Sequence, residues 1–350
     1  MVEMNKRIIV PFCFIFAATV LIAFRRAETA GKNEIEAETQ FFAMNTYISL
    51  TAYGSEAEAA LSGAEGQIRE LEDLWSVTEE QSEIYRLNHH QENSMTVSTE
   101  TADLISYALD MAKQTDGALE PTIYPVLCEW GFTTKEHNVP SAEEIERILE
   151  YVGYEKVVLN GTEIEMPEGV QLDMGAVAKG YIGDLVIQQM KEQGISSAML
   201  SLGGNIQVIG TKPDGSLWRV GLRDPFGQSS FGILEVSDCA VITSGGYQNN
   251  FTDEAGNVYH HIIDPATGKP AENGLASVTV TGKEGRMCDA LSTALFVMGT
   301  EKATLYWQEH GDFEMVLVDT DGGVYITEGI EKQFSLTEEY ASAPFQVIRR

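Results

Sequence analysis

The order of the predicted helices and strands is the feature that most constrains the fold of this chain. Helical patterns dominate the first half, and strand patterns rich in β-branched residues dominate the second half. No linker divides residues 40–350, and the helices and strands do not alternate as βαβ units. No repeat with a period of about 20 to 50 residues recurs. The sequence therefore predicts a single α+β unit, either as one body or as two lobes.

Helices are predicted where a capping residue precedes apolar side chains at helical spacing. The first spans Ser55–Trp75, and its start has the composition of a capping box. A second helix follows Ser98, and a third follows Ser141, where another capping box begins. Further helices are predicted over Gly175–Gln193, from near Asp289 and from near Thr300.

Strands are predicted from alternating or β-branched patterns between turn residues. A strand over Phe41–Tyr53 begins the unit, and Glu155–Met166 has the pattern of a hairpin. The remaining predicted strands lie in the second half: Leu217–Leu222, Gly232–Val236, Cys239–Thr243, Ser277–Thr281, Met315–Val318 and Val324–Thr327.

The first residues have the pattern of a membrane-insertion signal. An uncharged apolar run, Ile8–Phe24, lies between two pairs of basic residues. It is short for a membrane span and contains Pro11, so signal peptide and signal anchor remain alternatives for residues 1–30. The sequence after the run has no clear cleavage site, which favours an anchor. We expect residues 31–39 to form a linker and residues 40–350 to form an extracytoplasmic domain at the cell membrane.

The charge of the chain limits its partners. With 23 Lys and Arg against 53 Asp and Glu, the formal net charge is −30. A surface this acidic repels nucleic acid, and no basic stripe offsets the charge after the N-terminal segment. An anionic ligand would need a bound cation, a lysine or the amides of a helix N-terminus.

One loop combines the features that such an anion would require. In the segment Asp173–Tyr181, Gly175 allows a turn at the start of a helix, and Lys179 lies one turn further along. The segment does not match a dinucleotide-binding or P-loop motif. It is equally consistent with Asp173 as a helix cap and a solvated Lys179.

Three other loops carry polar residues suited to chemistry. Paired glycines before Asn205 and after Ser244 permit tight turns or a close approach to a ligand. His260 and His261 precede a turn, and neighbouring strand residues face opposite ways, so only one can point into a site. That histidine could act as a general base.

Asp289 and Thr293 are four residues apart, which places both side chains on one face of a helix. Carboxylate and hydroxyl oxygens are hard ligands suited to Mg²⁺. A capping aspartate and a threonine bonded to its own helix form the simpler alternative.

Several short segments, taken in order, resemble the ApbE family, the FAD:protein FMN transferases. The segments are Ala43–Thr46, Ser82–Asn88, Gly117–Thr122, Trp130–Phe132, Asp173–Tyr181, Leu202–Asn205, Thr243–Gly245, His261–Gly268 and Asp289–Thr293. Each is modest alone, but their shared order is specific.

The resemblance implies an exported, often membrane-attached α+β protein related to the tunnelling fold. Such proteins split FAD with Mg²⁺, transfer FMN to a Thr or Ser of a partner through a phosphoester bond, and release AMP. Typical acceptors carry a Ser/Thr-Gly-Ala-Thr-like motif. They are subunits of membrane redox complexes or extracytoplasmic reductases.

The resemblance also implies roles for individual residues. It makes His261 the catalytic base. It also implies that the metal ligands are the carbonyl of Ala176 and the side chains of Asp289 and Thr293. It assigns contacts with FAD to the following residues: Met44, Ala118, Leu119, Glu120, Asp173, Lys179 and Ile263. Glu120 departs from the aspartate that is usual at its position.

Two other functions remain open at this stage. Water in place of the Thr hydroxyl would make the protein a metal-dependent FAD pyrophosphatase that yields FMN and AMP. A surface flavin-binding protein without chemistry is the second alternative. The residue types do not distinguish Mg²⁺ from Mn²⁺.

Overall fold

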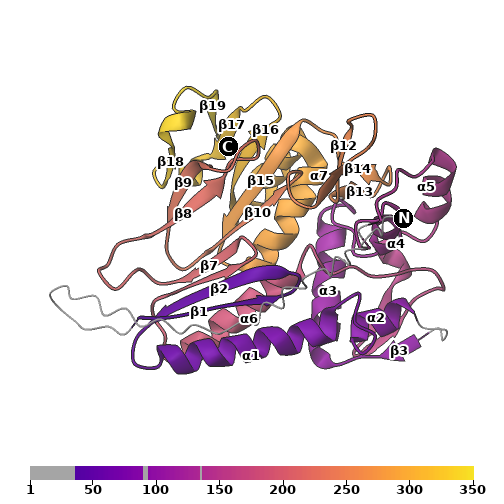
Figure 1. The fold of residues 1–350 in the computed structure, drawn as a ribbon, viewed down its shortest axis with the longest axis horizontal. Helices are drawn as coiled ribbons and strands as arrows, with labels where there is room; N and C mark the ends of the chain where they lie inside the picture. Colours follow the sequence, from indigo (N-terminus) through magenta and orange to yellow (C-terminus); the bar gives the residue numbers. More distant parts are fainter. Residues whose placement is uncertain (1–35, 90–93, 135) are drawn as a thin grey trace, which may run out of the picture.

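The computed structural model describes residues 36–89, 94–134 and 136–350, and its centre is a nine-stranded sheet (Figure 1). All neighbouring strands of the sheet run antiparallel except the last pair, which is parallel. In spatial order the strands are β1 (Glu36–Ala43), β2 (Thr46–Tyr53), β6 (Ala198–Leu202), β7 (Asn205–Ile209), β10 (Ala240–Gly245), β15 (Leu275–Gly282), β16 (Glu314–Asp319), β17 (Val324–Thr327) and β19 (Phe345–Ile348).

Helices cover one face of this sheet and enclose the larger core. The sheet packs mainly against α1 (Ala57–Trp75), α6 (Ala178–Glu192) and α7 (Gly285–His310), and α3 (Thr99–Gln114) adds side chains to the same core. Alternate strand residues supply the two faces, so Ile242 and Leu317 pack in this core while Val241 and Val316 pack on the opposite side. The sheet is therefore buried on both faces.

A smaller sheet covers the opposite face. It consists of β8 (Trp218–Arg223), β9 (Ser230–Val236) and β18 (Phe334–Leu336), with β9 in the middle. Large side chains such as Trp218, Phe231 and Phe334 fill the space between the two sheets. In Figure 1 these strands lie at one end of the molecule, away from α3.

The short elements form the periphery. The helices are α2 (Glu83–Asn88), α4 (Tyr124–Glu129) and α5 (Ala142–Leu149), with single 3₁₀ turns η1 (Tyr154–Lys156), η2 (Glu328–Ile330) and η3 (Glu338–Tyr340). The small strands are β3 (Ser94–Thr96), β4 (Val158–Asn160), β5 (Glu163–Glu165), β11 (Asn250–Thr252), β12 (Val258–His260), β13 (Ile263–Asp264) and β14 (Lys269–Pro270).

The α+β class is confirmed, and so are the predicted strands of the second half and the hairpin, which is β4 and β5. The capping box at Ser141 is present. The two helices predicted near Asp289 and Thr300 are the two parts of α7, which is interrupted at Gly299 with φ of +76°.

Three local predictions were wrong. The predicted strand Phe41–Tyr53 is a hairpin, because Met44 and Asn45 adopt left-handed φ values of 51° and 54° and turn the chain. The hairpin's first strand already begins at Glu36, inside the expected linker. The capping box predicted at Ser55 does not form, since Glu56 is the N-cap and makes no side-chain cap bond.

The helix expected from Gly175 begins at Ala178, because the chain first makes a turn. The apolar run Ile8–Phe24 lies outside the described residues. Among the residues that are described, no helix is both long and apolar enough to cross a membrane.

Candidate active site

The candidate site is centred where α6 and α7 make an unusually close contact. A Cβ atom at Gly180 would lie 2.3 Å from the Gly285 carbonyl oxygen and 2.6 Å from the Cβ of Asp289. Only glycine allows the two helices to approach this far. The close approach lets the Gly180 amide donate a 2.8 Å hydrogen bond to Oδ2 of Asp289.

Asp289 is a buried carboxylate. Its side chain is 4% exposed, and it forms no ion pair with any described residue. The side chain of Asn205 donates a 2.9 Å hydrogen bond to Oδ1. Burial raises the pKa of Asp289, while the charge of Lys179 and these two hydrogen bonds oppose the rise.

Hydroxyl groups gather one turn further along α7. The Ser244 Oγ at the end of β10 lies 2.8 Å from the Oγ of Ser292 and 3.1 Å from the Oγ1 of Thr293. Thr293 follows Asp289 at helical spacing, as the sequence predicted. Asp289 and the hydroxyls therefore form a set of hard oxygens along one stretch of helix.

The turn before α6 brings further polar groups to this helix. Asp173 accepts a hydrogen bond from the Gly175 amide, so it stabilises the turn and does not cap α6, whose N-cap is Val177. Lys179 donates to the Gly175 carbonyl at 3.1 Å. The Gly180 amide donates to Asp289 and not to the carbonyl of Ala176, four residues earlier.

Lys179 is the electrostatic centre of the site. Its positive charge acts on the carboxylates of Asp173 and Asp289 and on the imidazole of His261. Burial is the main cause that raises the pKa of both carboxylates, and Lys179 counteracts it. These groups, far apart in the sequence, therefore share one electrostatic environment.

The two histidines face different surroundings, as the strand pattern predicted. The His260 ring lies edge-on to Phe296 with centroids 5.4 Å apart, and the His261 ring lies edge-on to Phe132 at 6.4 Å. Burial lowers the pKa of His261 to about 4, with smaller contributions from His260 and Lys179. The imidazole is thus neutral at pH 7, and its buried Nδ1 has no hydrogen-bond partner among the described residues.

Other residues assigned to FAD by the resemblance lie in more structural settings. Glu120 accepts hydrogen bonds from the Thr122 amide and hydroxyl and from the Tyr154 amide. Leu119 and Ile263 are buried, 3% and 6% exposed.

Two short connections tie the remaining assigned residues to the site. The Asp173 amide donates to the Pro121 carbonyl at 2.8 Å, which joins the Asp173 turn to the segment with half-buried Ala118. Met44 lies in the β1–β2 turn, and its amide donates to the Glu72 carboxylate. The same turn abuts the β6–β7 turn through a Gly203 amide bond to the Tyr47 carbonyl.

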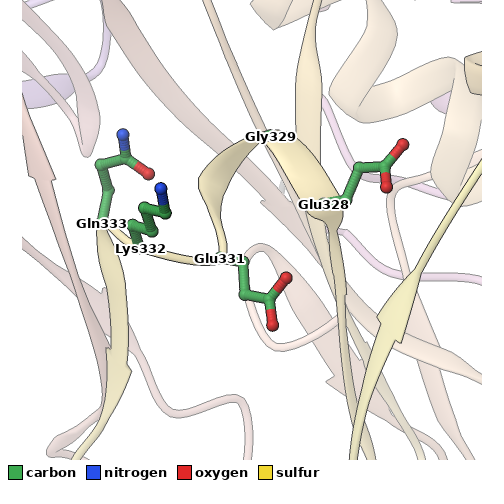
Figure 2. Close-up of a pocket in the computed structure, with 5 residues that line it drawn as sticks. All are labelled: Glu328, Gly329, Glu331, Lys332 and Gln333. Atoms are coloured by element: carbon green, nitrogen blue, oxygen red, sulfur yellow. The ribbon is translucent and has the colours of Figure 1, made fainter.

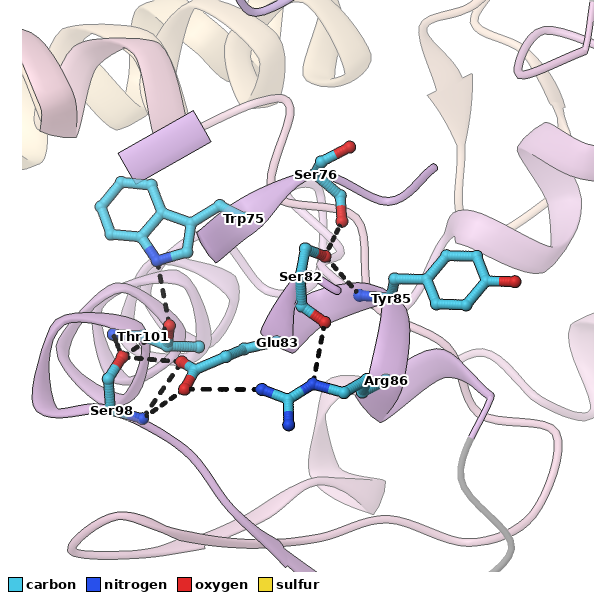
Figure 3. Close-up of polar contacts among 8 residues, drawn as sticks. All are labelled: Trp75, Ser76, Ser82, Glu83, Tyr85, Arg86, Ser98 and Thr101. Carbon is cyan, nitrogen blue, oxygen red and sulfur yellow. Dashed lines mark hydrogen bonds and ion pairs between the residues drawn. The ribbon is translucent and has the colours of Figure 1, made fainter. Parts of the chain in front are cut away.

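The segment Ser82–Asn88 connects the start of α3 to the chain before Asp173 through hydrogen bonds. Ser82 caps α2, and Glu83 accepts hydrogen bonds from the Ser98 amide and hydroxyl at the start of α3 (Figure 3). At the other end of α2, Asn88 exchanges two hydrogen bonds with the backbone of Leu172, at 2.8 and 2.6 Å. These hydrogen bonds fix the position of the chain directly before Asp173.

Sequence reasoning assigned no role to Asn88, Gly180, Asn205, Gln207 or Ser244. Most of them lie in segments that matched the family pattern, so that pattern was the available signal. Their partners come from elements distant in the sequence, which the sequence pattern does not specify.

Two surface hollows lie elsewhere. One, of about 660 Å³, lies around the turn after β17 and is lined by Glu328, Gly329, Glu331, Lys332 and Gln333 (Figure 2). Its two glutamates pair with Arg349 at 3.5 and 2.9 Å. The other, of about 500 Å³, is lined by His137, Asn138, Val139, Phe251, Thr252, Asp253 and Glu254. Neither contains a residue of the candidate site.

A lysine beside a glycine turn suits a phosphate group, and the buried carboxylate and hydroxyls suit a hard cation, so the site belongs to the class that binds phosphorylated ligands. Comparison with known proteins makes this class specific. The chain belongs to the ApbE family, whose model matches residues 44–317. The resemblance drawn from the sequence motifs is thereby confirmed.

Related proteins support the same assignment. An FAD:protein FMN transferase of Vibrio cholerae is 33% identical over 286 residues, covering 80% of this chain and 81% of the relative. One of Klebsiella pneumoniae is 32% identical and covers 83% and 92%. The crystal structure of an ApbE protein from Thermotoga maritima superposes with a TM-score of 0.80 at 31% identity, covering 85% and 99%. The flavin transferase ApbE of Vibrio cholerae gives 0.78 at 28% identity, with the same coverage.

Proposed function

We propose that this flavin transferase moves the FMN half of FAD onto a Thr or Ser hydroxyl of an exported partner protein and releases AMP. The observation that carries the proposal is geometric: the turn into α6 binds Asp173 at the Gly175 amide, Lys179 at the Gly175 carbonyl and Asp289 at the Gly180 amide. The charge of Lys179 also acts on His261. A cation and a lysine at this point would admit an anionic dinucleotide to a protein with a net charge of −30.

The residues present fit a bound Mg²⁺. Among the described residues there is no cluster of three or more His, Cys, Asp or Glu side chains that could hold a metal. We assign the metal to the carboxylate of Asp289, the hydroxyl of Thr293 and the carbonyl of Ala176, the set implied by the family resemblance and made up of hard oxygens. Among the residues that the structure describes, the buried Asp289 has no ion-pair partner, and a bound cation would offset the cost of burying its charge. When bound, Mg²⁺ would neutralise charge on the pyrophosphate, and Mn²⁺ accepts the same ligands.

The remaining residues would supply binding and proton transfer. We assign contacts with FAD to Met44, the segment 118–120, Asp173, Lys179 and Ile263, with Lys179 next to the phosphates. The acceptor oxygen attacks the FMN-side phosphorus, a P–O bond forms, and the P–O bond to AMP breaks. His261 takes the hydroxyl proton as the bond forms.

The protonation state of His261 is consistent with a role as the base. Its imidazole is neutral at pH 7 because burial lowers the pKa to about 4. Nearby phosphate charges would raise that pKa once FAD is bound, which makes proton acceptance easier at the moment it is needed.

We further propose that the acceptor carries a Ser/Thr-Gly-Ala-Thr-like motif and is a subunit of a membrane redox complex or an extracytoplasmic reductase. The apolar run Ile8–Phe24 supports attachment of residues 1–30 to the cell membrane, as an anchor or a cleaved signal, with residues 40–350 outside the cytoplasm.

The test is incubation of the full chain in detergent with FAD, Mg²⁺ and a peptide that contains the acceptor motif. Mass spectrometry should show FMN added to the motif's last Thr and AMP in equal amount. A peptide with Val in place of that Thr is the control. Absence of an adduct on every acceptor tested would contradict the proposal. Free FMN without acceptor would indicate a pyrophosphatase, and FAD binding without cleavage would indicate a flavin-binding protein.

A further inference from the structure

Asn205 is a buried polar residue whose side chain points at the proposed metal ligand. It is 4% exposed, and its Nδ2 donates to Oδ1 of Asp289 at 2.9 Å. The Gly180 amide occupies the other carboxylate oxygen at 2.8 Å. One donor on each oxygen fixes the plane of the carboxylate and leaves further lone pairs on both oxygens.

We propose that Asn205 is the positioning residue of the metal site, which holds the Asp289 carboxylate in the orientation a divalent cation requires. The inference rests on the proposed function, because that function makes Asp289 a metal ligand. Residues that hydrogen-bond to a metal ligand orient it, and their loss weakens metal binding.

The backbone holds Asn205 in place with little freedom. Asn205 pairs with Leu202 across a two-residue turn, Gly203-Gly204, in which both glycines have left-handed φ values of 64° and 97°. Two successive positive φ values define a turn that side chains other than glycine rarely allow. A Cβ at Gly203 would lie 2.4 Å from the hydroxyl of Thr46, so this turn also packs tightly against the β1–β2 turn.

This contact links Asn205 to the Met44 turn. Thr46 directly follows Met44 and Asn45, which form the β1–β2 turn. A displacement of that turn would therefore move the β6–β7 turn. The side-chain amide of Asn205, which orients Asp289, would move with it.

The strand that carries Asn205 also provides a matched control. Gln207 lies two residues along β7, is 3% exposed, and donates its Nε2 to the Gly180 carbonyl at 3.0 Å. It contacts the same part of α6 but not the Asp289 carboxylate. A purely structural role would make Asn205 and Gln207 equivalent, whereas a positioning role separates them.

The experiment titrates the full-length apo protein with Mn²⁺, with and without FAD, and measures free Mn²⁺ by electron paramagnetic resonance. Asn205→Leu removes the donor at similar volume and should weaken Mn²⁺ binding by about tenfold or more. Asn205→Ser, whose side chain is too short for its hydroxyl to reach Asp289, should weaken Mn²⁺ binding to a similar extent. This variant replaces Asn205→Leu if Asn205→Leu does not fold. Gln207→Met should change Mn²⁺ binding by less than about threefold, even where its melting temperature falls.

Two results would overturn the inference. One is Mn²⁺ binding within about threefold of wild type in a folded Asn205 variant. The other is a loss of Mn²⁺ affinity in Gln207→Met as large as that in the Asn205 variants. Wild-type protein that binds no Mn²⁺, or binds it unchanged after Asp289→Ala, would instead refute the metal assignment in the proposed function, and the inference with it.

Discussion

The two faces of the central sheet are covered in different ways. On one face, α6 and α7 approach closely at Gly180, and polar side chains such as Asp289 and Asn205 are buried between them and the strands. On the other, β8, β9 and β18 cover the sheet with large apolar side chains such as Phe231. Burying a carboxylate without a cation costs stability, whereas burying aromatic rings provides it. The chemistry proposed above therefore lies on the helical side, and the small sheet has the packing of a structural support.

Two buried aspartates give the sharpest test of this difference. We expect Asp289→Ala to reduce FMN transfer on the order of a thousandfold, because it removes the only proposed carboxylate ligand of the cation. The melting temperature should stay the same or rise, since an unpaired buried charge is removed. Mass spectrometry of the acceptor measures FMN transfer, and thermal unfolding measures the melting temperature.

Asp224, on the side of the small sheet, is the matched control. It is 8% exposed and accepts hydrogen bonds from the Phe226 amide and the Tyr340 hydroxyl. Asp224→Ala should lower stability by about 1 to 3 kcal/mol and leave transfer per folded molecule within about twofold. Similar activity losses in both variants would break the comparison.

The small sheet should respond to a cavity with a loss of stability and no loss of chemistry. Phe231 is 1% exposed, and its ring lies 6.3 Å from Phe334 and 5.9 Å from Tyr340 between centroids. Phe231→Ala should cost about 3 to 4 kcal/mol in urea unfolding. Transfer by the folded fraction is expected to stay near the wild-type rate, and a selective loss of transfer would show that the two sides are coupled.

His261 should make the helical side sensitive to acid. Its folded pKa is about 4, below the unfolded value of 6.5, so between these values the unfolded chain binds a proton that the folded chain excludes. Stability contributed by the neutral ring is therefore full above about pH 6.5 and is lost as the pH falls toward 4. Urea unfolding at pH 7.5 and pH 5 should show a smaller acid-induced loss in His261→Gln, by at most about 2 kcal/mol. Parallel pH profiles for wild type and variant would contradict this.

Two helix glycines should give opposite and smaller effects. Gly180→Ala would force α6 and α7 apart, which we expect to cost about 1 to 3 kcal/mol and to lower transfer. Gly66 lies exposed in α1, and an added Cβ there would meet nothing within 4 Å. Gly66→Ala should stabilise by about 0.5 to 1 kcal/mol with unchanged transfer. Thermal unfolding of both variants compares them directly, and stabilisation by Gly180→Ala would refute the close packing.

The sequence predicted the fold best where the signal was local. Periodicity and capping residues located α1, α3, α5 and most strands of the second half, because each depends on a few neighbouring residues. It failed at the β1–β2 turn, where the left-handed conformations of Met44 and Asn45 carry no glycine signal. Strands β6 and β7 were not predicted, although the glycines between them, Gly203 and Gly204, indicated either a tight turn or a close approach to a ligand.

For the site, the sequence by itself determined the chemical groups and the family. The order of the motifs indicated ApbE, and helical spacing placed Asp289 and Thr293 on one face of α7. Only the tertiary structure decided which groups meet: Asn205 and Gly180 reach Asp289 across 84 and 109 residues. The Gly180 bond exists because Gly180 and Gly285 let two helices pack closely, and the Asn205 bond exists because α7 also packs on β7. Such a contact depends on the space between elements distant in the chain, which no local pattern encodes.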